Sequence, residues 1–286
     1  MQFSEIPRQS VVAGRFYPDG DKALHDVVSR YLGMQPQKVV DLKGREVLSL
    51  LLPHAGYVYS APVVGVTLGR LTLPDRIILL GPNHTGQGKP LSVWNGGAWL
   101  TPLGAVPVDK DAATGLVAAN AGFYADMEAH LQEHSLEVLL PFFQVTNPNV
   151  RVTPVTVSRL PLAALEKAGE ALAGVVSAAA ASGEKILIVV SSDMSHYLPH
   201  EKTVAMDSLA LATAKTLDPE KVFSVVQDNA ISMCGIAPFT LALFALKRLG
   251  ATNLRVLAYA TSGQAGRAVG ADMSKVVGYA GVVISR

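Results

Sequence analysis

Several side chains that can bind a metal or move a proton stand directly after apolar runs of this sequence. His54 follows the run that ends at Leu52, and His84 follows a run closed by a Gly-Pro pair. A third apolar run leads into Asp193 and His196. Cys234, the one cysteine, stands just before a helical pattern. Because ligands of open α/β sheets bind beyond the carboxyl ends of the strands, these side chains are candidates to converge there.

A set of imidazoles with a thiolate or carboxylate is the ligand chemistry of zinc, iron and copper. Two histidines with one anionic ligand leave open positions on the metal, as an iron-dependent oxygenase requires. His54 and His84 lie 30 residues apart, and Cys234 lies a further 150 residues along the chain. No local motif such as H-E-x-x-H is therefore present, and only the fold can assemble such a site.

Each of these residues also has a purely structural interpretation. A histidine after a strand can be a turn residue that is hydrogen-bonded to backbone. Cys234 can be a small buried apolar residue, although its place before a helix favours the thiolate. Asp193 can cap a turn, and Glu133 and Glu137 can stabilise the dipole of the helix that they precede. His25 and His130 lie in helical patterns that we expect to face solvent.

Other chemistries find less support in the sequence. Neither a G-x-G-x-x-G nor a G-x-x-x-x-G-K-[ST] phosphate loop is present. A G-x-S-x-G nucleophile elbow is also missing, which disfavours a serine hydrolase of the α/β-hydrolase type. The sequence leaves open a further possibility, in which Cys234 is a nucleophile and His196 is its base.

The elements that must position these residues are short apolar runs alternating with longer helical patterns. The predicted strands are Val47–Leu52, Arg76–Leu80, Val150–Val157, Lys185–Val190, Leu254–Ala260 and Lys275–Ile284. The predicted helices are Ala61–Leu71, Ser135–Gln144, Pro161–Ala181, His200–Leu217 and Ile236–Leu249. Continuous Val- and Ile-rich runs are typical of strands buried on both faces. The pattern predicts one α/β domain over residues 1–286, with a mostly parallel or mixed central sheet flanked by helices.

Composition indicates which binding partners and which cellular compartment to expect. The 286 residues carry a formal net charge of +1, with 49% hydrophobic and 16% charged residues. Without a basic cluster we expect no binding to nucleic acid. We expect no membrane association, because no stretch offers the roughly 20 apolar residues of a spanning helix, and the N-terminus lacks a signal pattern. A single cysteine suits a reducing cytoplasm.

At these same segments the chain resembles the Memo family, whose bacterial and archaeal members are labelled AmmeMemoRadiSam system protein B. The motifs run in order from residue 12 to residue 280 and cover nearly the whole chain. They are Val12-Ala13-Gly14-Arg15-Phe16-Tyr17-Pro18, Pro53-His54-Ala55-Gly56-Tyr57, Gly81-Pro82-Asn83-His84, Glu133-His134-Ser135-Leu136-Glu137, Ser191-Ser192-Asp193-Met194-Ser195-His196-Tyr197, Cys234-Gly235 and Val277-Gly278-Tyr279-Ala280.

The resemblance implies a fold like that of the class III (LigB-type) extradiol dioxygenases, which hold non-haem Fe(II). It implies His54 and His84 as metal ligands, with Cys234 where those enzymes have a carboxylate. His196 falls where they have an acid/base histidine, and Asp193 is implied to orient the site. The family motifs further imply that three residues line the substrate pocket, namely His134, Glu137 and Tyr57. Because thiolate is a softer ligand than carboxylate, copper or zinc is an alternative to Fe(II).

Three functions follow as hypotheses. The first is a metal-dependent, dioxygenase-like redox enzyme in which His196 moves a proton of the substrate. The second is a non-catalytic protein that binds a peptide or metabolite in the same cleft, because related folds host unrelated functions. A zinc or cysteine hydrolase ranks third. The family label also implies a functional link to a radical-SAM protein and an AMMECR1-type protein.

Overall fold

The long apolar runs of the sequence form the strands of one central sheet. The structure is a computed structural model that describes residues 1–34, 44–267, 270 and 272–286. Its strands are β1 (Val47–Leu52), β2 (Arg76–Pro82), β3 (Leu91–Val93), β4 (Trp99–Thr101), β5 (Gly104–Val106), β6 (Tyr124–Ala125), β7 (Arg151–Val157), β8 (Ile186–Ser191), β9 (His196–Leu198), β10 (Asn253–Thr261) and β11 (Val276–Ser285). Its helices are α1 (Asp21–Leu32), α2 (Tyr57–Leu68), α3 (Lys110–Ala118), α4 (Glu128–Leu131), α5 (Leu140–Thr146), α6 (Leu162–Ala181), α7 (His200–Ala214), α8 (Pro219–Asp228), α9 (Ile236–Arg248) and α10 (Ser262–Ala265), with a 3-10 turn at Glu137–Leu139.

The sheet is mixed, with a parallel centre. Its strand order is β10-β11-β1-β8-β2-β7-β3-β6, and β9 pairs with β11. β1, β8, β2 and β7 run parallel to one another, whereas β11 is antiparallel to both β1 and β10 and β3 is antiparallel to β7. Parallel strands end at the same edge of a sheet, so the loops after β1, β8, β2 and β7 emerge side by side.

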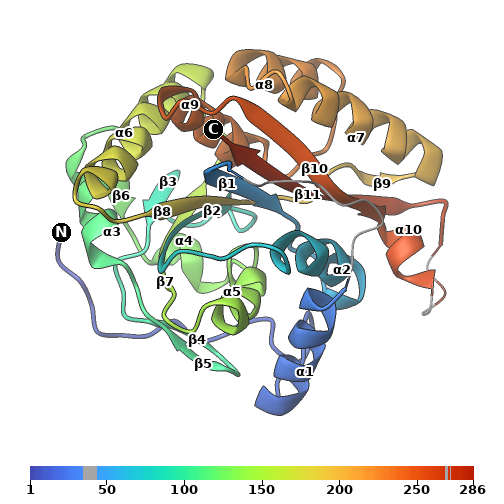
Figure 1. Cartoon of the computed structure of the whole chain (residues 1–286), viewed down its shortest axis with the longest axis horizontal. Helices are drawn as coiled ribbons and strands as arrows, with labels where there is room; N and C mark the ends of the chain where they lie inside the picture. The colour runs from blue at the N-terminus through green and yellow to red at the C-terminus, as the bar shows by residue number, and fades with distance from the viewer. Residues whose placement is uncertain (35–43, 268–269, 271) are drawn as a thin grey trace.

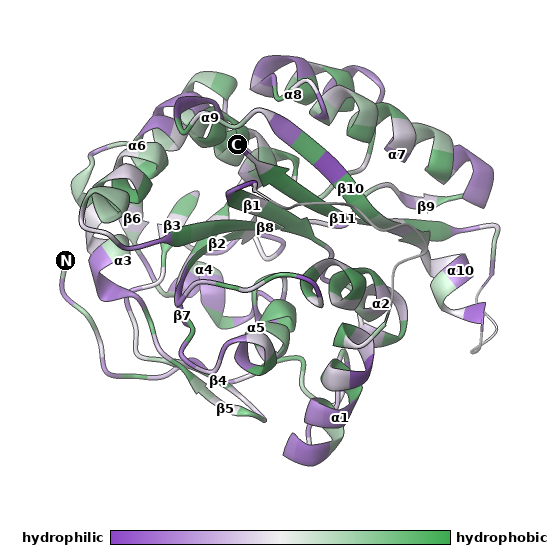
Figure 2. Ribbon diagram, in the orientation of Figure 1, coloured by the Kyte–Doolittle hydropathy of each residue, from purple (hydrophilic) through white to green (hydrophobic). Residues whose placement is uncertain are grey.

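Helices cover both faces of this sheet, which explains why its strands are apolar without alternation. Along β1, Leu50 and Leu52 belong to one core cluster and Leu51 to the other, because successive side chains point to opposite faces. α1, α2 and α5 cover one face, and α3, α6, α7, α8 and α9 cover the other (Figure 1). Figure 2 shows the apolar character of β1, β8 and β11, and polar residues along the edge strand β10.

The predicted α/β class and the six predicted strands are confirmed, with bounds that shift by at most two residues. The predicted helix Ser135–Gln144 is instead a 3-10 turn followed by the shorter α5. The predicted helix Ala61–Leu71 begins earlier, at Tyr57, and ends before Gly69. The strands that the sequence did not reveal, such as β3 and β9, have two or three residues, too few to produce a recognisable pattern.

The expectation that His130 faces solvent is wrong. His130 is completely buried, and its ring lies 5.7 Å from the ring centroid of Trp94 and 5.9 Å from that of Trp99. α4 is helical as expected, but it is a single turn held against the body of the protein, so its pattern says little about exposure.

Across the described ranges, no helix combines the length and the apolar character that a membrane span requires.

Candidate metal centre

The carboxyl edge of the parallel strands brings most of the candidate residues together. His54 follows β1, Asp193 follows β8 and His84 follows β2, and these three strands are adjacent in the sheet. The rings of His54 and His84 lie 5.3 Å apart between centroids. Cys234 reaches the same place from the turn before α9, and its Sγ lies 3.5 Å from Nε2 of His54.

The hydrogen bonds of His54 determine which ring nitrogen is free to bind a metal. Its Nδ1 lies 2.8 Å from Oγ of Ser191, and that hydroxyl donates its own proton to the carbonyl oxygen of Ser135 at 2.6 Å. The hydroxyl must therefore accept from Nδ1–H of His54, which leaves a lone pair on Nε2. His54 is buried, and burial lowers the pKa of its imidazole, so the ring stays neutral.

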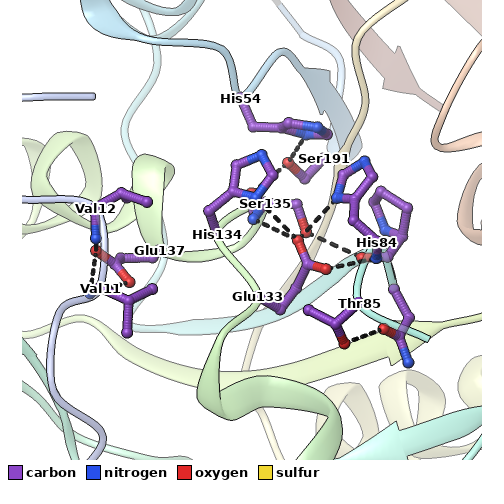
Figure 3. A network of polar contacts seen from close by, with 12 residues as sticks. Val11, Val12, His54, His84, Thr85, Glu133, His134, Ser135, Glu137 and Ser191 are labelled. Atoms are coloured by element: carbon purple, nitrogen blue, oxygen red, sulfur yellow. Dashed lines mark hydrogen bonds and ion pairs between the residues drawn. The ribbon is translucent and has the colours of Figure 1, made fainter. Parts of the chain in front are cut away.

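His84 is fixed by a buried carboxylate. Its Nδ1 lies 2.9 Å from Oε1 of Glu133, and its backbone N–H donates to Oε2 of the same residue at 2.6 Å (Figure 3). Burial raises the pKa of Glu133, but the hydrogen bond and charge of His84 outweigh burial and hold it at about 2. An ionised Glu133 only accepts hydrogen bonds, so Nδ1 of His84 carries a proton and Nε2 is the nitrogen left to bind a metal. Burial opposes a charged imidazole here, but the hydrogen bond and charge of Glu133 raise the pKa of His84, so Nε2 offers its lone pair once the ring has lost its second proton.

Cys234 completes a three-donor set. One ligand atom from each of His54, His84 and Cys234 lies within 4.8 Å of the other two. Two imidazoles and a thiol around one point fit zinc, iron or copper, whose bonds to nitrogen and sulfur measure about 2.0–2.3 Å. The donors therefore suit the metal that the sequence resemblance implies.

The expectation that the helix start favours the Cys234 thiolate is not met by the protein groups alone. Burial and the nearby charge of Asp193 raise the pKa of this thiol. The backbone N–H of Asp193 donates to Sγ at 3.2 Å, which works in the opposite direction but does not compensate. A coordinated cation deprotonates a thiol outright, so a thiolate here requires a bound metal.

His196, Asp193 and His134 surround the three donors. The Nδ1 of His196 lies 2.8 Å from the carbonyl oxygen of Ser232, which can only accept, so Nδ1 carries the proton and Nε2 is free. Oδ1 of Asp193 accepts from the backbone N–H of His54 at 2.9 Å, and burial raises the pKa of this carboxyl. The ring of His134 stacks on that of His84 at 4.9 Å between centroids, and burial lowers its pKa.

A cavity of about 940 Å³ opens over this group. His54, His84, His134, Asp193, His196 and Cys234 all line it. The imidazole in contact with Cys234 is that of His54, whereas the Nδ1 of His196 is bonded to Ser232. The structure therefore does not pair Cys234 with His196 as nucleophile and base.

Two predicted pocket residues, Glu137 and Tyr57, do not line this cavity. Glu137 is fully buried and accepts hydrogen bonds from Arg8 at 2.7 Å and from the hydroxyl of Tyr17 at 2.6 Å. The hydroxyl of Tyr57 donates to the carbonyl oxygen of Val138 at 2.9 Å. Both side chains therefore belong to the packing beside the site, where their polar atoms bind other parts of the protein.

Sequence reasoning did not assign a site role to Glu133 or Ser191, which orient the two histidines. The sequence predicts that Glu133 stabilises a helix dipole, but no helix of the structure begins directly after it. A signal was present, because ligand histidines almost always donate their second N–H to a carboxylate, carbonyl or hydroxyl. An acidic residue directly before His134 in a family motif was the candidate for that role.

Comparisons with known proteins agree with the sequence resemblance. The sequence model of the family described as Memo-like protein matches residues 8–283. A MEMO1 family protein of Aquifex aeolicus is 37% identical over 281 residues, which cover 96% of this chain and 98% of the relative. A MEMO1 family protein of Pyrobaculum arsenaticum is 36% identical over 286 residues, covering 98% of this chain and 99% of the relative. One of Sulfolobus acidocaldarius is 37% identical over 290 residues, covering 96% and 98%.

Proposed function

The chain belongs to the Memo family, and we propose that it acts as a metal-dependent, dioxygenase-like redox enzyme. The observation that carries this proposal is the three-donor set of His54, His84 and Cys234. The hydrogen bonds at Nδ1 orient both imidazoles so that Nε2 is the nitrogen turned away from Ser191 and Glu133. We propose Fe(II) as the metal, with copper or zinc as alternatives because one donor is a thiolate.

A redox-active metal held by three protein donors would supply open coordination positions and electron transfer. The protein residues would bind and orient a substrate beside it. His196 is suited to act as the base, because its Nδ1–H is held by Ser232 and its Nε2 is free to take a proton from a substrate hydroxyl. Asp193 keeps the His54 backbone and the Cys234 thiol in place through its own carboxylate and its backbone N–H.

The metal content of the purified protein tests the ligand assignment. Protein purified without oxygen is expected to contain about one equivalent of iron or copper, measured by elemental analysis, because three donors suffice to hold one ion. His54→Ala and Cys234→Ser should each lose the metal. His25→Ala is the matched control, because His25 is exposed on α1. If His54→Ala keeps the wild-type metal content, the ligand assignment is wrong.

The role of His196 is tested by turnover. His196→Ala should retain the metal and lose oxygen consumption with catechol-like substrates, because the base is removed and the donors are not. His200→Ala is the control, since the Nδ1 of His200 contacts Thr261 and its side chain does not line the cavity. If His196→Ala keeps full activity, His196 is not the base.

A second candidate function is a non-catalytic protein that binds a peptide or metabolite in the same cleft. The size of the cavity favours keeping this candidate, because about 940 Å³ exceeds what one metal ion and a diatomic molecule require. Protein that takes up neither iron, copper nor zinc, and still binds ligands in this cavity, would support the binding function instead.

A further inference from the structure

The cavity extends well beyond the metal donors, and its far wall is apolar. Phe223 and Val226 of α8, Ile231 in the following turn, and Ile236 and Ala237 of α9 contribute to this wall. Such a wall binds the carbon skeleton of a ligand by removing apolar surface from water. A ligand that uses the whole cavity therefore has an apolar body as well as a group near the donors.

Arg159 adds a positive charge to the same cavity. Among the described residues that line the cavity, it is the only lysine or arginine, and Asp193 is the only acid. Arg159 follows β7, whose last residue, Val157, pairs with Pro82 at the end of β2. Because His84 follows β2 in the same way, Arg159 leaves the sheet one strand away from a proposed metal ligand.

The guanidinium of Arg159 has no partner among the described residues. Arg159 is an exposed residue, and its side chain makes no hydrogen bond or ion pair with the described part of the chain. Buried arginines of this protein are used differently: Arg8 donates to Glu137, and Arg76 donates to Asp109. Arg159 is thus available to a ligand.

We propose that the cavity binds an organic carboxylate with an apolar body, whose carboxylate lies on Arg159. One guanidinium matches the two oxygens of a carboxylate with two parallel hydrogen bonds. The described lining offers one guanidinium and one acid, Asp193, and this low positive charge favours a carboxylate monoanion over a phosphate dianion. That this ligand is the substrate of a redox site rests on the proposed function, whereas its binding does not.

The test compares ligands that share one apolar body and differ in their head group. The probes are 4-phenylbutanoate and 4-phenylbutanamide, with 4-phenylbutyl phosphate as a third, and their affinities are measured by isothermal titration calorimetry. The full-length protein is used as purified. Wild type is expected to bind the acid about tenfold more tightly than the amide, as a charge-assisted hydrogen bond implies. Equal affinities, no binding of the acid, or tighter binding of the phosphate would overturn the proposal.

Variants then locate the charge. Arg159→Gln should abolish the preference for the acid, and Arg159→Lys should retain part of it, because lysine keeps the charge but not the paired geometry. Arg30→Gln is the control, since Arg30 is an exposed arginine of α1 outside the cavity. An unchanged preference in Arg159→Gln would show that the carboxylate does not lie there.

A second variant pair examines the apolar wall. Phe223→Ala should weaken acid and amide by the same factor, because it removes contacts with the shared body and leaves the charge in place. Val58→Ala, at an exposed apolar position of α2, serves as its control. If Phe223→Ala changes neither affinity, the body of the ligand does not contact this wall.

The failure of this proposal is separable from that of the proposed function. Wild-type protein freed of metal with a chelator should still prefer the acid over the amide, because Arg159 is untouched. A protein that binds metal normally but shows no preference for the acid would overturn only the carboxylate site. A protein with the preference but without metal would overturn only the redox function.

Discussion

At the scale of single residues, two buried side chains outside the donor set decide how the histidines are presented. Ser191 and Glu133 each hold the Nδ1 of one imidazole, and Figure 3 shows both contacts on the side away from the free nitrogens. An imidazole that rotates freely, or carries its proton on Nε2, does not offer a lone pair at the required point. The two partners therefore orient the site without binding the metal.

Glu133→Gln tests this role. The variant keeps the size of the side chain but loses the charge that holds Nδ1–H of His84, so metal affinity should fall by roughly 10- to 100-fold. Competition with a chelator of known affinity measures the effect. Glu128→Gln, at an exposed position of α4, is the control. Wild-type affinity in Glu133→Gln would mean that His84 is oriented by other contacts.

His130 predicts a dependence of stability on pH. Burial lowers its pKa to about 3, against 6.5 in the unfolded chain. Between these values the unfolded state binds one more proton than the folded state. The contribution of His130 to the free energy of unfolding is therefore complete above pH 6.5 and decreases as the pH falls toward 3. The loss is about 1.4 kcal/mol per pH unit for this group.

The pH dependence is measured by urea unfolding between pH 4 and 7. His130→Phe, which cannot take up the proton, should lose this share of the slope, whereas His25→Phe on α1 should keep it. Equal slopes for wild type and His130→Phe would show that His130 is not responsible.

At the scale of elements, the packing of helices on the sheet places the turn that carries Cys234. α9 begins two residues after Cys234, and α6 packs along it. Gly169 of α6 allows this close approach, because a Cβ there would lie 2.5 Å from Cβ of Phe244 and 2.6 Å from the carbonyl oxygen of Leu241. Gly174, on the same helix, has no atom within 4 Å of such a Cβ.

The two glycines of α6 form a matched pair. Gly169→Ala should destabilise the protein by about 1–3 kcal/mol, because neighbouring backbone must shift to admit the methyl group. Gly174→Ala should stabilise it by roughly 0.5–1 kcal/mol through helix propensity alone. Urea unfolding of both variants measures the difference. Two equal changes of the same sign would show that α6 and α9 are not in close contact.

At the scale of the whole molecule, hydrogen bonds hold the N-terminal segment around Arg8 against the segment from His130 to Glu137, which lies beside the site. Arg8 is 1% exposed, and its guanidinium donates to Glu137 and to the carbonyl oxygens of His130 and Glu133. Glu137 in turn accepts from the backbone N–H groups of Val11 and Val12 at 3.0 Å. This network fixes the segment that holds Glu133 and His134.

Arg8→Ala should therefore destabilise the protein strongly, by about 3–5 kcal/mol, because it leaves the buried carboxylate of Glu137 without its cation. Thermal unfolding at neutral pH measures the loss. Arg15→Ala is the control at an exposed arginine of the same segment, and its effect should stay within about 0.5 kcal/mol. A similar melting temperature for both variants would mean that the Arg8–Glu137 pair adds little.

The sequence by itself determined the long strands and the class of the fold, because apolar runs bounded by turns are local patterns. It also located His54, His84, Asp193 and His196, since each follows or lies near a strand end, and Cys234 before its helix. Only the tertiary structure decided that Glu133 is hydrogen-bonded to His84, 49 residues away, and that Glu137 accepts from Arg8, 129 residues away. It likewise decided that His130 is buried and that Arg159 joins the cavity. Hydrogen-bond partners and burial depend on which distant segments pack together, and no local periodicity records that.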